Sequence, residues 1–209
     1  MRLTKFGHAC VRLEDDGAVL VIDPGTLSEP ESVDGVDAVL ITHEHFDHLD
    51  VNKLADALAK RPSVEVYTNP SVADQLADLG DVVHRVTPGE AFTAAGFAVK
   101  TFGGLHALIH PELPRVPNLG FFIENGGVYH PGDSFDIPED VEVQTLFVPV
   151  AGPWMKIAEA VEFVRAIGPR QAYALHDGIL SEAGHGIVTG TMQRLCHCAY
   201  ARRPEEPAA

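Results

Sequence analysis

The chain has 209 residues, 45% of them hydrophobic and 22% charged, which is enough sequence to bury the core of one globular domain. Its formal net charge of −15 at pH 7 argues against unspecific binding of nucleic acid, because polyanions are repelled over most of the surface. No apolar run approaches the ~18 residues of a membrane span, and no apolar segment follows the first residues as in a signal peptide. We therefore predict a cytoplasmic protein with no membrane partner.

In the first half of the chain, short apolar segments alternate with turns. Strands are predicted at 2–6, 9–14, 18–22, 38–41, 64–67 and 82–86. Asp15-Asp16-Gly17 between the second and third strands is a strong hairpin signal. Apolar residues at helical spacing predict a helix over 51–60, and Ser71 is the expected N-cap of a second helix that ends at Leu79.

The second half contains two expected hairpins and then returns to alternating strands and helices. The hairpins are 91–93 with 97–102 and 119–124 with 128–130. Between them, residues 103–118 read as a long loop, a length that is uncommon unless the loop is functional. The remaining expected elements are strands at 145–150 and 171–175 and helices at 156–167 and 190–197.

Hairpins combined with βαβ units indicate an α/β fold in which two mixed sheets pack face to face with helices outside. We expect a single domain over residues 1–201 and a disordered tail over 202–209. Three cysteines cannot all pair, so a disulfide framework is not expected. Cys196-His197-Cys198 lacks the second ligand pair of a structural zinc site and is assigned to the last helix.

One stretch, Thr42-His43-Glu44-His45-Phe46-Asp47-His48, directly follows the apolar strand at 38–41. Neutral imidazole is the commonest metal ligand, and carboxylate beside imidazole suits zinc, iron or manganese. The two histidines at i and i+2 can face one position, while the Asp-His pair can face a second one nearby. This spacing therefore favours two cations over one.

Three more ligand-type residues come directly after predicted strands. They are His106, Asp133 and His176. An α/β framework presents its site at the ends of its strands, so we expect these side chains to lie near the first stretch.

The stretch 42–48, together with His106, Gly132-Asp133-Ser134 and His176, resembles the metallo-β-lactamase-fold superfamily of metal-dependent hydrolases. Gly7-His8-Ala9-Cys10 and Asp23-Pro24-Gly25 are similar to the branch of short proteins related to ascorbate-6-phosphate lactonase. The resemblance implies a four-layer αββα sandwich with the site along one edge.

The resemblance also implies a dinuclear site. One metal would be held by His43, His45 and His106, and the second by Asp47, His48 and His176. Asp133 would bridge the two. Zinc is the expected metal, with manganese and iron as alternatives. Water shared by two cations becomes hydroxide near neutral pH and is the expected nucleophile, and Asp47 can accept its proton.

Six further residues are expected to contact the substrate or the ligands: His8, Asp23, His110, His130, Trp154 and His185. His110 competes with His106 as a ligand; His106 is favoured because it follows its strand directly, and His110 then lines the pocket. His8 either contacts substrate or is a hydrogen-bonded strand-end residue, and Asp23 is expected to brace the ligand loop.

The other three carry alternatives as well. His130 is expected to fill the edge of the core beside Asp133. Trp154 either forms a wall of the pocket or belongs to the core. His185 stands between two glycines, in a segment expected to be a flexible loop that could close over substrate.

The leading hypothesis is a hydrolase that acts on an ester, lactone or similar bond of a small-molecule substrate. A phosphodiesterase or nuclease-type hydrolase on the same two metals is the alternative, although the acidic surface and the lack of a basic arm count against nucleic acid. A non-catalytic or redox metal-binding module ranks third. The long middle loop could serve a homo-oligomer.

Overall fold

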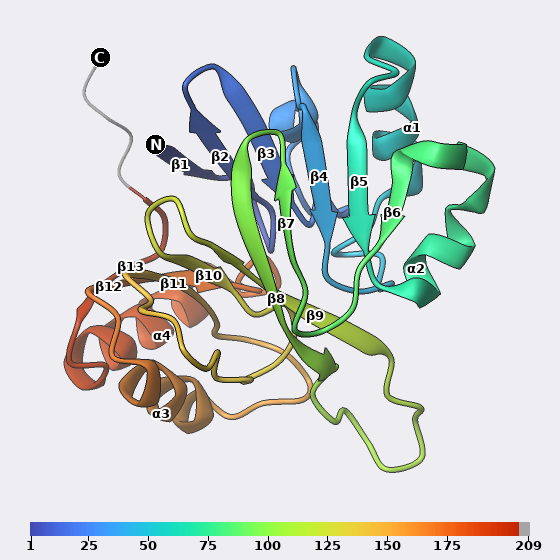
Figure 1. Ribbon diagram of the computed structural model, residues 1–209. Coiled ribbons are helices and arrows are strands. Elements are labelled where there is room, and N and C mark those ends of the chain that lie inside the picture. The colour runs from blue at the N-terminus through green and yellow to red at the C-terminus, as the bar shows by residue number, and fades with distance from the viewer. Residues whose placement is uncertain (205–209) are drawn as a thin grey trace.

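Two mixed β-sheets face each other, and helices cover their outer faces (Figure 1). The structure is a computed structural model that describes residues 1–204. One apolar cluster fills the space between the sheets, and two more lie between each sheet and its helices. The chain therefore has the four-layer αββα architecture that the sequence predicted.

The first sheet has the strand order β1-β2-β3-β4-β5-β6. Its strands are β1 (Arg2–Lys5), β2 (Val11–Asp15), β3 (Ala18–Ile22), β4 (Ala38–Ile41), β5 (Glu65–Thr68) and β6 (Val83–Arg85). Neighbouring strands pair antiparallel from β1 to β3 and parallel from β3 to β6. Helices on its outer side are η1 (Pro30–Val33), α1 (Val51–Lys60), α2 (Pro70–Gln75) and η2 (Ala77–Val82).

The second sheet has the order β13-β12-β11-β10-β9-β8-β7. Its strands are β7 (Ala91–Ala94), β8 (Phe97–Leu105), β9 (Pro117–Ile123), β10 (Val128–His130), β11 (Thr145–Pro149), β12 (Gln171–Leu175) and β13 (Ala199–Ala201). Two helices, α3 (Ile157–Ile167) and α4 (Glu182–Leu195), cover its outer face.

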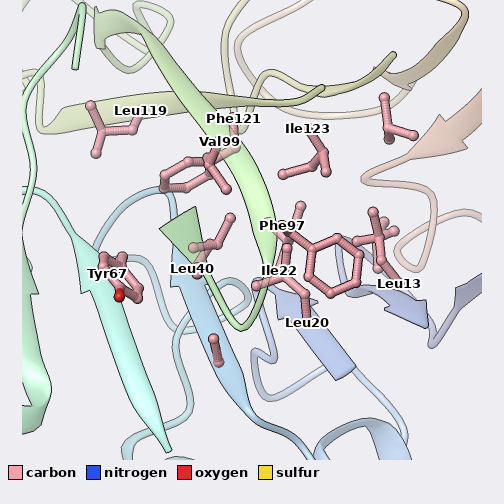
Figure 2. Close-up of a cluster of buried hydrophobic side chains, with 14 of the residues drawn as sticks. Leu13, Leu20, Ile22, Leu40, Tyr67, Phe97, Val99, Leu119, Phe121 and Ile123 are labelled. Atoms are coloured by element: carbon pink, nitrogen blue, oxygen red, sulfur yellow. The ribbon is translucent and has the colours of Figure 1, made fainter. Parts of the chain in front are cut away.

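Alternation of side chains explains why the inner strands are apolar throughout. In β3, Leu20 and Ile22 point into the cluster between the sheets, whereas Val19 and Val21 point toward the helices. Figure 2 shows Leu20 and Ile22 beside Phe97 of the facing sheet. Successive side chains of a strand point to opposite faces, so a strand that is covered on both faces needs apolar residues at every position.

Local capping fixes the helices next to the ligand-rich stretch. The Asp50 side chain accepts hydrogen bonds from the backbone N–H groups of Asn52 (3.0 Å) and Lys53 (3.2 Å), so α1 begins at Val51 as expected. The second helix differs from the prediction, because Asn69 is its N-cap and Pro70 its first residue, whereas Ser71 lies inside it. It ends at Gln75, and a 3₁₀ helix continues the chain.

Two larger expectations were wrong. Strand β8 continues through Gly103 and Gly104 to Leu105, which pairs with Pro117, so the long loop covers 106–116 and not 103–118. Helix α4 begins at Glu182, with Ser181 as its N-cap, and not near residue 190. Cys196-His197-Cys198 follows this helix as a turn into β13, which the sequence reading missed.

The end of the described chain is anchored. Arg202 donates from Nε to Asp177 Oδ2 at 2.7 Å, and Asp177 also pairs with the buried Lys5 of β1. Of the tail predicted over 202–209, residues 202–204 are described and 205–209 lie outside the described residues, so disorder there stays a prediction. Among residues 1–204, no helix combines the length and apolar character of a membrane span. The three cysteines are free.

Candidate metal centre

Loops at one edge of the sandwich bring the predicted ligands together. His43 to His48 lie between β4 and α1, and His106, Asp133 and His176 follow β8, β10 and β12. Their ligand atoms form two groups, in each of which all atoms lie within 4.8 Å of one another. The first group is His43, His45, His106 and Asp133, and the second is His8, Asp47, His48 and His176.

Asp133 joins the two groups. Its Oδ2 lies 3.3 Å from His106 Nε2 in the first group and 3.0 Å from His176 Nε2 in the second. Its Oδ1 lies 3.1 Å from His48 Nε2. This buried carboxylate therefore lies between the two groups and within reach of nitrogens of both.

The donor atoms fit metal ions. Among residues 1–204, the buried atoms His48 Nε2, His106 Nε2 and Asp133 Oδ1 have no hydrogen-bond partner. Buried polar atoms without partners are costly, and a cation on their lone pairs removes that cost. Imidazole and carboxylate form the donor set of zinc, manganese and iron sites.

Neighbouring carboxylates favour positive charge at two histidines of the centre, His48 and His176. Burial lowers the pKa of His43, whereas the carboxylates of Asp133 and Asp23 outweigh burial and hold the pKa of His48 well above its usual range. Burial also opposes charge on His176, but Asp133 and Asp47 raise its pKa to about 9. Burial raises the pKa of Asp133, but His48 and His176 hold it well below its usual range, so it stays ionised.

Asp23 orients a histidine in each group. His48 Nδ1 donates to Asp23 Oδ2 at 2.7 Å, which leaves His48 Nε2 free to bind a cation. The Thr42 hydroxyl donates to the same oxygen at 2.7 Å and accepts from His43 Nδ1 at 2.9 Å, so His43 Nε2 is the nitrogen without a proton, and it lies 3.1 Å from His45 Nδ1. Asp23 is thus placed as predicted, but the relay through Thr42 was missed, and its only sequence signal was a hydroxyl directly before the first histidine.

The turn that carries Asp23 also supports the ligand loop. Gly25 packs so closely on the loop that a Cβ atom would collide with the backbone of Asp47. Thr26 N–H donates to the carbonyl of Phe46 at 2.9 Å. The loop's position is therefore set by backbone packing as well as by the histidine hydrogen bonds.

His8 belongs to the second group and is hydrogen-bonded to Asp47 in this geometry. The Gly178 N–H donates to His8 Nδ1 at 3.0 Å, so the neutral ring carries its proton on Nε2. That Nε2–H lies 3.1 Å from Asp47 Oδ2. Burial lowers the pKa of His8, which keeps the ring neutral. Of the two expectations for His8, the hydrogen-bonded strand-end residue agrees with the structure.

The structure brings His106, and not His110, into the centre. His106 is buried, its Nδ1 faces the carbonyl of Ala107, and its own carbonyl accepts from Arg115 Nε at 2.7 Å. His110 is exposed, and its Nδ1 accepts from the Glu112 N–H at 3.2 Å. His110 does not line the pocket, contrary to expectation, because it caps a turn of the loop.

The remaining predicted residues have mixed outcomes. His130 is buried and hydrogen-bonds to the carbonyl of Ala9 at 2.9 Å, so it belongs to the core edge as expected. His185 lies inside α4, 3.6 Å from Asp177, and the expectation of a flexible loop was wrong. Asn118 was missed; its buried side chain accepts from the Asp133 N–H at 3.0 Å, and no local pattern signalled that role.

A pocket of about 500 Å³ opens onto the centre. Five of its lining residues belong to the two groups: His45, Asp47, His106, Asp133 and His176. The other six are Glu44, Phe46, Ile109, Pro153, Trp154 and Ile179. Trp154 thus lines the pocket, which is the first of its two predicted roles.

Comparison with known proteins identifies the family of this chain. The sequence model of the family described as "Beta-lactamase superfamily domain" matches residues 2–176, which include every predicted ligand. The chain belongs to this superfamily. Its fold is similar to that of the metallo-β-lactamase fold protein YhfI from Bacillus subtilis, with a TM-score of 0.71 and 18% identity over 93% of this chain and 88% of that one.

Two relatives align with most of this chain. Protein Rv0786c of Mycobacterium tuberculosis is 38% identical over 213 residues, covering 100% of this chain and 99% of that protein. A UPF0173 metal-dependent hydrolase of Aeropyrum pernix is 31% identical over 202 residues, covering 85% of this chain and 82% of that protein.

Proposed function

We propose that this chain is a metal-dependent hydrolase that cleaves an ester, lactone or similar bond in a small molecule. The observation that carries the proposal is the position of Asp133, whose two oxygens face ligand-type nitrogens of both groups. The name of the Aeropyrum relative supports hydrolysis, and the similarity to ascorbate-6-phosphate lactonase, which stays a prediction, favours a lactone.

The proposed ligands divide as the two groups do, except that His8 is assigned as a hydrogen-bond partner of Asp47. The first cation is assigned to His43, His45 and His106 and the second to Asp47, His48 and His176, with Asp133 shared. When bound, two divalent cations lower the pKa of water to near neutrality and polarise a carbonyl oxygen. Zinc is the cation we propose first, because histidine-rich ligation suits it.

The chain's own groups then position the reaction. Asp133 holds the two halves of the centre together, and Asp23 keeps the free nitrogens of His43 and His48 aimed inward. Asp47 keeps a carboxylate oxygen at the mouth of the pocket, held by His8, and we assign it to accept the proton released from the attacking water.

Phosphodiester hydrolysis remains the alternative to test. Phosphate sites usually carry arginine or lysine, and the described lining residues of the pocket include neither. We therefore rank carbonyl substrates first.

A cytoplasmic location also stays a prediction.

The test is metal analysis followed by a substrate panel. Protein purified without chelators should contain about two divalent metal ions per chain, and chelation should abolish hydrolysis until zinc, manganese or iron is restored. The panel consists of 4-nitrophenyl acetate, γ-butyrolactone and bis(4-nitrophenyl) phosphate. Turnover of the phosphodiester alone would favour the alternative, and turnover that survives complete metal removal would overturn the proposal.

A further inference from the structure

Part of the pocket lining beside the ligands is apolar and exposed. Phe46 is 66% exposed, Ile179 55% and Ile109 37%, although all three line a pocket next to a polar centre. Soluble proteins rarely leave contiguous large apolar side chains in water without a function for them. The three residues come from separate loops, after β4, β8 and β12, so their meeting is a property of the folded site.

Trp154 connects this wall to the ligands. Its ring centroid lies 5.7 Å from that of His106 and 6.1 Å from that of His176, one ligand from each group. Phe135 packs behind the indole with ring centroids 5.4 Å apart. A group lying on Trp154 would therefore be held next to both halves of the centre.

Positive charge is missing from the same wall. Among the described lining residues there is no lysine or arginine, and the charged residue outside the two groups is Glu44. Glu44 Oε2 is taken up by α2, where it accepts from Ser71 Oγ at 2.6 Å and Gln75 Nε2 at 3.1 Å. The nearest arginine, Arg115, lines a small neighbouring recess that shares His45, His106 and Ile109 with the pocket, and its Nε is occupied by the His106 carbonyl at 2.7 Å.

We propose that this wall, formed by Phe46, Ile109, Trp154 and Ile179, binds an uncharged alkyl or aryl group of the substrate. The site then selects hydrophobic esters or lactones and rejects substrates that carry a phosphate or carboxylate on that group. The inference rests on the proposed hydrolase function and adds the substrate class. It departs from a sugar-phosphate lactone, because a phosphate in this wall would meet apolar side chains and no cation.

A ladder of substrates tests the inference on the metal-loaded protein. For 4-nitrophenyl acetate, butyrate and octanoate, kcat/KM should rise by about two- to fourfold per methylene, the gain expected when a chain leaves water for a partly open apolar pocket. The mono-4-nitrophenyl ester of suberic acid matches the octanoate in length but ends in a carboxylate. Its kcat/KM should be at least about tenfold lower than that of the octanoate.

Two isoleucines provide a matched pair of variants. Ile179→Ser removes an exposed side chain of the wall and should flatten the ladder. Ile187→Ser removes one that is 72% exposed on α4 outside the pocket, and the ladder should keep its slope. A flat ladder in the wild type, or a preference for the suberate ester, would overturn the inference while leaving the hydrolase function intact.

A binding measurement separates the two proposals if none of the esters is turned over. Trp154 is the one tryptophan of the chain, so its fluorescence reports on the pocket directly. Octan-1-ol should change the emission saturably and bind at least about tenfold more tightly than butan-1-ol, with the difference reduced in Ile179→Ser. Equal affinities would overturn the inference.

A second copy of the chain is the competing occupant of the wall. In that case Ile179→Ser would lower the sedimentation coefficient from that of a dimer to that of a monomer and leave the substrate ladder unchanged. This outcome would also overturn the inference. The inference is supported if Ile179→Ser flattens the ladder and leaves the sedimentation coefficient unchanged.

Discussion

The two loops that meet at the centre differ in how firmly they are held. The loop at 42–48 is tied to the turn at 23–26 by side-chain hydrogen bonds and backbone packing, and its residues His43 and His48 are fully buried. The loop at 106–116 projects from the ends of β8 and β9 (Figure 1). It contributes one ligand, and its tip exposes Leu108, Ile109 and Leu113.

This difference separates two tasks. The loop at 42–48, called here the braced loop, fixes donor atoms in the geometry that a metal centre needs. Such precision requires side-chain rotamers that are locked by neighbouring residues. The loop at 106–116, called here the projecting loop, has its two ends joined by the His106 N–H to the Val116 carbonyl, and the Ala107 N–H ties it to the Asp133 carbonyl. It can vary without disturbing most ligands, so we expect it to influence substrate choice more than metal binding.

Asp133→Asn should have the largest effect, because it removes the charge that both groups share. We expect metal content to fall at both positions and kcat/KM to drop by at least about a thousandfold. Metal analysis and ester hydrolysis provide the readouts. Asp140→Asn, an exposed change in the same region, is the control, and full metal occupancy in Asp133→Asn would refute the shared-ligand assignment.

Asp23→Asn should come next. The amide can still accept from Thr42, but it loses the charge that orients His48, and metal affinity should fall by about 10- to 100-fold. Competition with a chromophoric chelator measures this affinity. An unchanged affinity would show that the ligand loop holds its histidines without the carboxylate.

Gly25→Ala tests the backbone support of the braced loop. The added methyl group collides with the Asp47 backbone, so the free energy of unfolding should fall by about 1–3 kcal/mol. Gly186→Ala has open space inside α4 and should raise stability by up to about 1 kcal/mol. Urea denaturation of both variants checks this, and equal effects would contradict the packing argument.

Arg115→Gln should have the smallest effect and act on the projecting loop alone. It removes one partly buried hydrogen bond to the His106 carbonyl, so KM should change by a few-fold at most, about 1 kcal/mol or less, with metal content retained. Steady-state kinetics measures the change in KM, and metal analysis measures the metal content. Loss of metal here would mean that the two loops are equally important for binding it.

Sequence reasoning succeeded where the signal was local. Helix α1 and strand β12 were predicted with their observed bounds, because apolar residues at helical spacing marked the helix and an apolar run that ends at a histidine marked the strand. Helix α4 was missed over its first turns because Gly184, Gly186 and Gly190 lower helix propensity, and packing of Met192 on the second sheet compensates.

The ligands were predictable for the same reason and the pocket was not. Each ligand follows a recognisable strand, whereas the relay through Thr42 and the support from Asn118 depend on residues that meet only in the fold. Ile109 and Ile179 gave no signal of lining one pocket, because they are 70 residues apart and belong to loops of unpredictable shape. The chemistry of the centre was therefore readable and its selectivity was not.

The central claim is that Asp133 is shared by two cations. A crystal structure of the zinc-loaded protein, with anomalous difference maps collected on both sides of the zinc absorption edge, tests it most directly. We predict two peaks, one contacted by His43, His45 and His106 and the other by Asp47, His48 and His176, with Asp133 touching both. A single peak that Asp133 does not contact would contradict the account.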